Sequence, residues 1–211
     1  MTDPAIFARN VPGSTEILLG STVAVAGCGG LGSNAAVALV RAGLGRLILA
    51  DHDVVEASNL NRQHFVLGDI GRGKLDALAG HLRAINPDVH LELHARTLAP
   101  EDVPRLFAGA DLLIEAFDRA DAKRWLIEAW CRAFPGRKVI CASGVSGLGK
   151  TEAIAVRRAG DIILCGDEVS DLSQGLCAPR VAVVANMQAN LAVEVLVAEK
   201  SSVSHGDDQQ P

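Results

Sequence analysis

The strongest restriction on the fold is a glycine pattern that follows an apolar run. Residues Val23–Ala26 are apolar, and Gly27, Gly29 and Gly32 come directly after them at the spacing G-x-G-x-x-G. This arrangement predicts a strand that turns tightly into a helix over 31–42, because glycine permits the turn and lets phosphate approach bare backbone. An anion is then expected at the helix N-terminus. The glycines predicted to form this anion site are Gly27, Gly29, Gly30 and Gly32.

A second apolar run, Leu47–Ala50, ends in Asp51, which lies about 20 residues beyond the glycines. An acidic side chain at this position can accept hydrogen bonds from ribose hydroxyls. The unit is therefore predicted to be β-α-β and to bind a nucleoside. Dehydrogenases, flavoproteins and adenylating enzymes share this pattern, so it leaves the class open. Glycines that serve only a tight turn are the structural alternative.

The rest of the chain alternates strand-like and helix-like segments. Continuous or alternating apolar runs predict strands, and apolar residues spaced three and four apart predict helices. We therefore expect a doubly wound, Rossmann-like, mainly parallel α/β sheet with a short antiparallel extension after residue 150. The expected strands cover 89–95, 111–116 and 138–142, the hairpin pairs 153–157 with 161–164, and the later helices cover 75–85, 100–107, a segment after 118, and 181–198.

Three segments are expected along the chain. Residues 1–20 form an N-terminal arm, with a short helix around 14–19, because Pro4, Pro12 and Gly13 break any longer helix. Residues 21–198 form a single nucleotide-binding domain. The polar residues 199–211 are predicted to be a disordered tail.

Charge and hydropathy narrow the classes of partner. The net charge of −5 argues against nucleic-acid binding, which needs clustered Lys and Arg. Polar residues interrupt the apolar region 181–198, so no membrane span is expected. The N-terminus lacks a signal-peptide pattern, which favours a cytoplasmic location. The interrupting residues are Asn186, Gln188, Asn190 and Glu194.

The five cysteines form no C-x-x-C pair, so no zinc site is expected and the thiols are predicted to be reduced. Cys177 is the one with two interpretations. A cation at Arg180 and a following helix would suit a reactive thiol. A small buried residue that positions the helix is the interpretation we favour, because free cysteine is often buried.

Two charged residues beyond the glycine unit are candidates for ligand contacts. Lys74 is expected at the start of a helix, where a cation is unfavourable, so an anionic ligand would explain it; a surface lysine is the alternative. Asp118 follows the strand 111–116 at the same edge of the sheet. Its carboxylate could cap the next helix or bind Mg²⁺ near phosphates.

A second phosphate motif is present but is not expected to function. Residues 144–151 match G-x-x-x-x-G-K-[ST]. A P-loop needs a long helix directly after this motif, whereas 152–158 is β-rich and broken at Gly160. We predict a glycine-rich turn between two strands.

These motifs together resemble the ThiF/MoeB/HesA family, the bacterial relatives of ubiquitin-activating enzymes, over about residues 5–198. The resemblance is carried by the glycine motif, by Asp51-His52-Asp53, by Ser58-Asn59-Leu60-Asn61-Arg62-Gln63, and by Lys74 and Asp118. It implies adenylation, with ATP and Mg²⁺, of the C-terminal glycine of a small ubiquitin-like sulfur carrier ending in Gly-Gly.

The resemblance also implies a role for each matching residue. Asp51 would hold the ribose, while Asn59, Arg62 and Lys74 would contact the phosphates. Asp118 would bind Mg²⁺. The family forms homodimers, and Arg9 matches the arm arginine that reaches into the partner subunit's site.

Some features depart from the better-known members of the family. Arg119 replaces an Asn after the metal-binding Asp, and no zinc cysteines are present. The stretch 175–181 resembles a short, zinc-free ThiF branch of thiamine thiazole biosynthesis, so a ThiS-like carrier is expected. The alternatives are activation of a molybdopterin or other sulfur carrier, a non-catalytic protein that binds nucleotide and docks a carrier, and an NAD-dependent oxidoreductase.

Overall fold

The computed structural model describes residues 4–204. In this part of the chain seven strands form one sheet in the order β3-β2-β1-β4-β5-β7-β6. All neighbouring pairs are parallel except β6 with β7, so the predicted fold class is confirmed. The strands are β1 (Thr22–Ala26), β2 (Arg46–Asp51), β3 (His90–Ala95), β4 (Leu112–Glu115), β5 (Val139–Ala142), β6 (Ala155–Ala159) and β7 (Ile162–Gly166).

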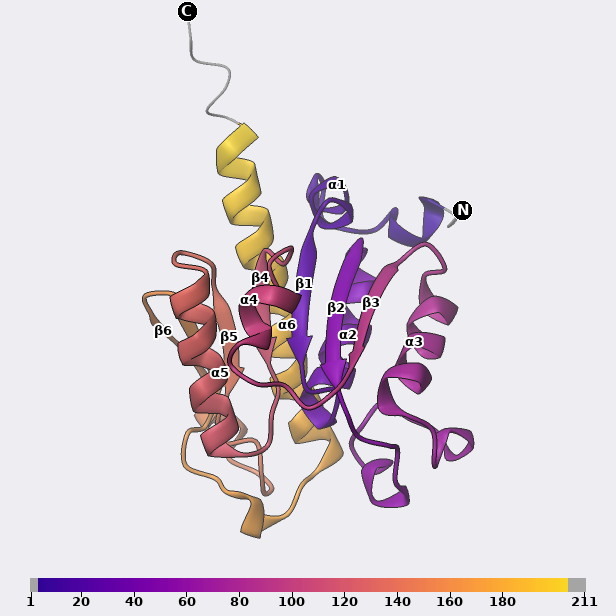
Figure 1. Cartoon of the computed structure of the whole chain (residues 1–211), viewed down its shortest axis with the longest axis vertical. Helices are drawn as coiled ribbons and strands as arrows, with labels where there is room; N and C mark the ends of the chain where they lie inside the picture. The colour runs from indigo at the N-terminus through magenta and orange to yellow at the C-terminus, as the bar shows by residue number, and fades with distance from the viewer. Residues whose placement is uncertain (1–3, 205–211) are drawn as a thin grey trace, which may run out of the picture.

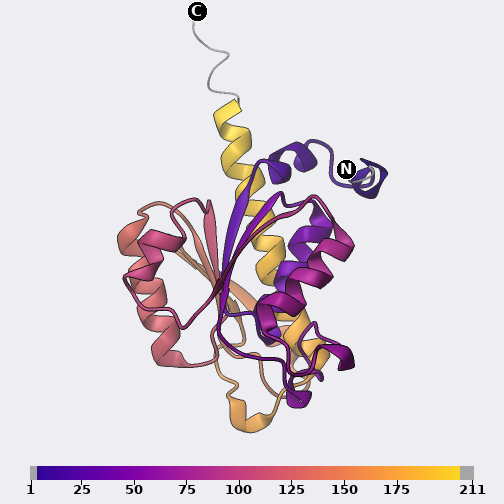
Figure 2. The same cartoon turned by 45° about the vertical axis from the view of Figure 1, so that its right-hand side comes forward.

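Helices cover both faces of the sheet (Figures 1 and 2). One apolar cluster lies between the sheet and helices α2, α3 and α6, and a second lies beneath α4 and α5. The central strands β1, β4 and β5 are apolar and almost fully buried, as expected for parallel strands covered on both sides. The helices are α1 (Ser14–Leu19), α2 (Gly30–Ala42), α3 (Lys74–Ile85), α4 (Asp102–Leu106), α5 (Ala120–Ala133) and α6 (Ala178–Ser204).

The β1–α2 turn depends on the missing side chain of Gly32. A Cβ at this position would lie 1.8 Å from the carbonyl oxygen of Gly27. Helix α2 therefore contacts the end of β1 directly, which is the packing role of the third glycine in this motif. Gly27 itself has a φ of +90°, a conformation that other residues rarely adopt.

The segment that matches the P-loop pattern does not form one. A short 3-10 turn, Thr151–Ala153, follows the motif and leads into β6. Strand β6 then pairs antiparallel with β7, with Ala155 opposite Gly166 and Ala159 opposite Ile162. The predicted hairpin and the glycine-rich turn are both present, but the first strand of the hairpin begins at Ala155 and not at Ala153.

Helix α6 differs from the prediction at both ends. It begins at Ala178 and continues to Ser204, so the prediction of disorder is wrong for residues 199–204, and the remainder of that tail lies outside the described residues. Lys200 stabilises the extension: its Nζ binds a carboxylate oxygen of Asp111 at 2.9 Å and the carbonyl oxygen of Gly20 at 3.2 Å. Neither partner is close to Lys200 in sequence.

No membrane span was expected in this segment, because polar residues interrupt its apolar run. By length and composition alone, the segment does pass as a possible span. Residues Ala178–Ser201 are long and apolar enough to cross a membrane, with a mean hydropathy of 1.6. Half of the apolar 18-residue stretch within this helix is buried inside the protein. Gln188 is fully buried and donates to the carbonyls of Glu115 and Ile140, at 3.0 and 3.2 Å. In this fold α6 is a core helix.

The N-terminal arm lies at the amino edge of the sheet (Figure 1). Its predicted helix is α1. Asn10 anchors the arm by donating to the carbonyl of Ala42, at the end of α2 (2.9 Å). Arg9 is exposed.

Substituting Gly32 with alanine should reduce the free energy of unfolding by about 2–3 kcal/mol, because the added Cβ meets rigid backbone. Gly80→Ala is the matched control. Gly80 lies inside α3, and no atom lies within 4 Å of the position that an added Cβ would take, so alanine there should stabilise by up to about 1 kcal/mol. Urea unfolding measures both changes. Equal effects of the two substitutions would contradict the close contact.

Candidate active site

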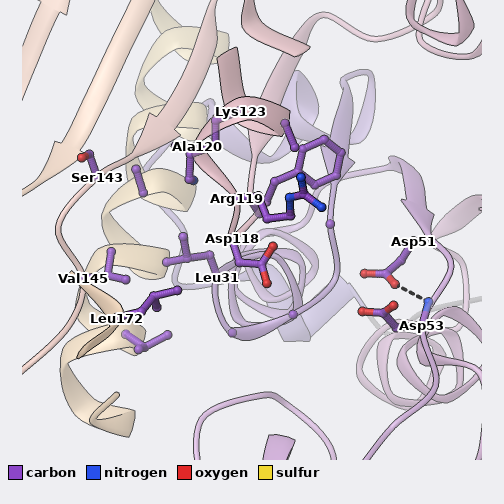
Figure 3. A pocket seen from close by; sticks show the side chains of 18 of the residues that line it. Leu31, Asp51, Asp53, Asp118, Arg119, Ala120, Lys123, Ser143, Val145 and Leu172 are labelled. Atoms are coloured by element: carbon purple, nitrogen blue, oxygen red, sulfur yellow. Dashed lines mark hydrogen bonds between the residues drawn. The ribbon is translucent and has the colours of Figure 1, made fainter. Parts of the chain in front are cut away.

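A cavity of about 730 Å³ opens at the carboxyl edge of the sheet, lined by the segments that follow β1, β2, β4 and β5. Strands β1 and β4 are neighbours there, and the chain order reverses between them. Open α/β sheets bind ligands at such a reversal. Asp51 and Asp53 lie on one side of the cavity, and Leu31, Val145 and Leu172 form an apolar side (Figure 3). Lys74, which binds Asp53, adds to the charged side.

Backbone forms the floor of the charged side. Gly27, Gly29 and Gly30 line the cavity, as predicted. Gly29 is the N-cap of α2 and offers no side chain to the free amides of the first turn, so these amides can donate to an anion. Gly32 is not among the lining residues. Its missing side chain has the packing role described above, and its predicted contact with the ligand stays a prediction.

Asp51 is held rigidly at the end of β2. One carboxylate oxygen accepts from the amide of Cys28 (2.6 Å) and the other from the amide of Asp53 (2.8 Å), a bond drawn in Figure 3. These bonds join the ends of β1 and β2 and fix the carboxylate toward the cavity. The position suits hydrogen bonds to the hydroxyls of a ribose.

Lys74 is 6% exposed although it begins helix α3. Its Nζ binds a carboxylate oxygen of Asp53 at 2.7 Å. Burial acts to raise the pKa of Asp53, but the hydrogen bond and the charge of Lys74 outweigh it, so that pKa is lowered. Asp53 therefore keeps the lysine ammonium in place at the cavity wall, where it can also reach an anion.

Of the two residues predicted from the Ser58–Gln63 motif to contact phosphates, only one lines the cavity. Arg62 lines the cavity, and its Nη1 donates to the carbonyl of Ser58 (3.0 Å) and to Oδ1 of Asn61 (2.8 Å). Asn59 does not line it. The Oδ1 atom of Asn59 accepts from the amide of Glu56 (3.1 Å), so this side chain caps its own turn. Its predicted phosphate contact stays a prediction.

Asp118 faces Asp51 and Asp53 across the cavity (Figure 3). Among the described residues it makes no hydrogen bond or ion pair, and Arg119, the N-cap residue of α5, has no side-chain cap. The helix-cap interpretation of Asp118 is therefore not supported. The guanidinium of Arg119 binds Asp121 (2.7 Å) and leaves the Asp118 carboxylate open to the cavity.

A buried ion pair that was not predicted lies below this turn. Glu115, fully buried at the end of β4, accepts from Nζ of Lys123 (3.0 Å) and from the amide of Phe117 (2.7 Å). Burial raises the pKa of Glu115, and the charge of Lys123 opposes that rise. The pair spans both ends of the segment that carries Asp118. An acidic residue at the end of the apolar run 112–114 was the available signal.

Cys177 lies outside the cavity lining, directly before α6. Its carbonyl accepts from the amide of Val181, so the predicted helix N-terminus is present. The predicted cation is not free, because the Arg180 guanidinium binds Asp167 and the carbonyl of Gly149. Cys177 is half-buried, less buried than expected, but the paired cation still favours its structural interpretation.

Together these features define the class: a Rossmann-like α/β protein whose cavity combines a glycine loop, a fixed carboxylate at the second strand and a buried lysine. The chain belongs to the ThiF family, which residues 6–207 match. The family expected from the motifs is thereby confirmed.

Known proteins show how far the likeness extends. The chain is 39% identical over 116 residues to the SAMP-activating enzyme E1 of Haloferax volcanii, covering 54% of this chain and 43% of that protein. It is 33% identical over 178 residues to ubiquitin-like modifier-activating enzyme 5 of Xenopus laevis, covering 79% and 42%. It therefore spans less than half the length of these curated relatives.

The fold also matches a solved structure. The E. coli tRNA N6-threonylcarbamoyladenosine dehydratase TcdA, in complex with ATP, superposes with a TM-score of 0.80 at 22% identity. The match covers 90% of each chain. At this identity the likeness establishes the fold alone.

Replacing Lys123 with methionine should lower the free energy of unfolding by about 3 kcal/mol, because it leaves the buried Glu115 without its cation. Arg124→Met is the control on the adjacent residue. Arg124 pairs with Glu128 at the surface, and such pairs contribute about 0.5 kcal/mol or less. A loss in the Lys123 variant no larger than in the control, by chemical unfolding, would contradict the role of the buried pair.

Proposed function

We propose that the chain is an ATP-dependent adenylyltransferase that activates the C-terminal glycine carboxylate of a small ubiquitin-like sulfur carrier. The observation that carries the proposal is the unpaired Asp118 carboxylate, which faces Asp51 and Asp53 across a cavity that Lys74 also lines. The names of the ThiF-family relatives, which activate SAMP or ubiquitin-like modifiers, support it. The ATP complex of the structural neighbour supports the choice of nucleotide.

The reaction requires little covalent chemistry from the protein. A carrier carboxylate oxygen attacks the α-phosphorus of ATP, the bond from that phosphorus to the pyrophosphate oxygen breaks, and an acyl adenylate forms. Asp51 orients the ribose, and the α2 amides hold phosphate oxygens. Lys74 and Arg62 offset the charge that accumulates on the leaving pyrophosphate. No general base is needed, because the carboxylate is ionised at pH 7.

Asp118 is the residue that would hold Mg²⁺. An exposed carboxylate without a hydrogen bond or ion pair among the described residues is a suitable ligand for this oxygen-seeking cation. When bound, Mg²⁺ supplies positive charge beside the phosphates. Asp51 and Asp53 are less suited, because amides hold the first and Lys74 holds the second.

The finer parts of the proposal rest on the resemblance. A ThiS-like carrier ending in Gly-Gly, a role in thiamine thiazole biosynthesis, the absence of zinc and a cytoplasmic location remain predictions. Activation of a molybdopterin or other carrier would use the same geometry. The likeness to a tRNA dehydratase raises a second candidate, activation of a carboxylate on tRNA.

Asp118→Ala should abolish carrier-dependent ATP–pyrophosphate exchange without changing the melting temperature, because the side chain has no structural partner among the described residues. A purified ThiS-like carrier ending in Gly-Gly serves as substrate. Glu128→Ala, on the outer face of α5, should behave as wild type. Retained exchange at saturating Mg²⁺ in the Asp118 variant would refute its assignment as the metal ligand.

Assembly is part of the same proposal. The N-terminal arm that carries Arg9 lies at the amino edge of the sheet, away from the cavity at the carboxyl edge of its own chain (Figure 1). We expect a homodimer in which the arm arginine serves the partner subunit's cavity.

Mixing Arg9→Ala protein with Asp118→Ala protein should restore part of the exchange activity, because a heterodimer contains one site with both residues intact. Native mass spectrometry confirms that subunits have exchanged. The absence of rescue after complete exchange would exclude action in trans.

A further inference from the structure

The turn between β4 and α5, residues 116–119, carries Asp118, the proposed ligand of Mg²⁺. Among the residues that the structure describes, the Asp118 carboxylate makes no hydrogen bond or ion pair, so the backbone of the turn sets its position. Mg²⁺ requires near-octahedral geometry, with oxygen ligands at about 2.0–2.1 Å. A misplacement of about 1 Å can lower a rate about 100-fold. The groups that hold this turn therefore decide whether Asp118 can bind the metal.

The first half of the turn rests on the glycine loop. The amide of Ala116 donates to the carbonyl of Ala26, at the end of β1 (2.9 Å). A Cβ added at Gly27 would lie 2.7 Å from the carbonyl oxygen of Ala116, so the two backbones are in direct contact there. This contact fixes where the turn begins, but Asp118 lies beyond it in the chain. A second anchor is needed for the part of the turn that carries the carboxylate.

The second anchor is Glu115, the last residue of β4, whose side chain is fully buried. Its carbonyl accepts from the side chain of Gln188 (3.0 Å), which fixes its backbone against α6. Its carboxylate accepts from the amide of Phe117 (2.7 Å), inside the turn. Both carboxylate oxygens also bind the ammonium of Lys123, at 3.0 and 3.2 Å. One buried residue thus joins the end of β4, the turn and the first turn of α5.

Lys123 holds the far end of the turn. Its amide donates to the carbonyl of Arg119 (3.0 Å), in the first turn of α5. Its bonds to Glu115 therefore connect residues on either side of Asp118 in the chain. Without the ammonium, the buried carboxylate would have no compensating charge, which is strongly unfavourable. Water or a proton would have to replace the ammonium, and the turn between the two residues would shift.

Lys123 also lines the cavity, so direct binding of phosphate is the alternative role. The bonds of its ammonium argue against that role, because both go to a fully buried carboxylate that would lose its charge partner. Arg62 differs, since its guanidinium binds neutral oxygens of Ser58 and Asn61 and can turn to an anion without such a loss. Lys123 is therefore suited to hold the turn and Arg62 to meet the ligand.

We propose that Glu115 and Lys123 are positioning residues for Asp118: their ion pair holds the turn so that the Asp118 carboxylate can bind Mg²⁺ in the cavity. Neither residue touches the metal or the nucleotide in this assignment. The inference rests on the proposed role of Asp118 as the metal ligand and adds the pair on which that role depends. The pair acts on ATP binding through the metal.

The test measures the Kd for ATP by isothermal titration calorimetry on the full chain, once with Mg²⁺ and once with EDTA. The ratio of the two Kd values is the contribution of the metal, which we call the Mg²⁺ gain. We expect a gain of at least tenfold for the wild type and no gain for Asp118→Ala. Lys123→Met should also lose the gain, while its Kd in EDTA stays that of the wild type. A merely structural role would leave the gain unchanged.

Two further variants separate position from stability. Lys123→Arg should keep the gain, because a guanidinium can bind both oxygens of Glu115. The double variant Glu115→Met/Lys123→Met should melt at a higher temperature than Lys123→Met, because no charge is left buried alone. It should still lack the gain, because the bond to the Phe117 amide is lost. Arg124→Met, at the adjacent surface position, should match the wild type in every measurement.

A wild-type gain in Lys123→Met or in the double variant would overturn the positioning role and leave the metal assignment intact. The double variant decides the matter if Lys123→Met does not fold. A gain that survives in Asp118→Ala, or that is absent from the wild type, would refute the metal assignment and this inference together. Carrier-dependent ATP–pyrophosphate exchange measures the proposed reaction separately. The expected pattern of gains without any exchange would refute adenylation and still support the positioning role.

Discussion

The close contact between α2 and the end of β1 determines much of this molecule. With no side chain at Gly32, the first turn of α2 rests on the carbonyl of Gly27, and the free amides of that turn face the cavity. The same contact sets the depth at which α2 packs on the sheet, and α6 packs in the same apolar cluster as α2. Anion binding and core packing therefore share one geometric condition.

The fold was largely predictable because its signals are local. Glycine spacing, apolar runs and helix periodicity gave the β-α-β unit, the later strands and the terminal hairpin. The extent of α6 was not predictable, because it depends on contacts distant in sequence. Gln188 was interpreted as a polar interruption, yet its amide bonds carbonyls of β4 and β5. Lys200 was assigned to a disordered tail, yet it binds Asp111.

The candidate site was predictable where function follows from position on the sheet. Asp51, Arg62, Lys74 and Asp118 line the cavity because each follows a strand end or begins a helix at the carboxyl edge. Asn59 belongs to the same motif but does not line the cavity, because its side-chain oxygen accepts a hydrogen bond from the amide of Glu56. The ion pairs Glu115–Lys123 and Asp167–Arg180 join residues 8 and 13 positions apart across turns, and only the folded loops reveal them.

If the cavity binds ATP as proposed, the way in which Asp51 is held also determines which nucleosides it tolerates. The amides of Cys28 and Asp53 bind its two oxygens, which holds the carboxylate in one orientation toward the proposed ribose position. A free 2′-hydroxyl can donate to it, whereas a 2′-phosphate would bring a second negative charge against a fixed one. The cavity should therefore discriminate against 2′-phosphorylated nucleotides such as those of reductive metabolism, irrespective of which carboxylate it activates.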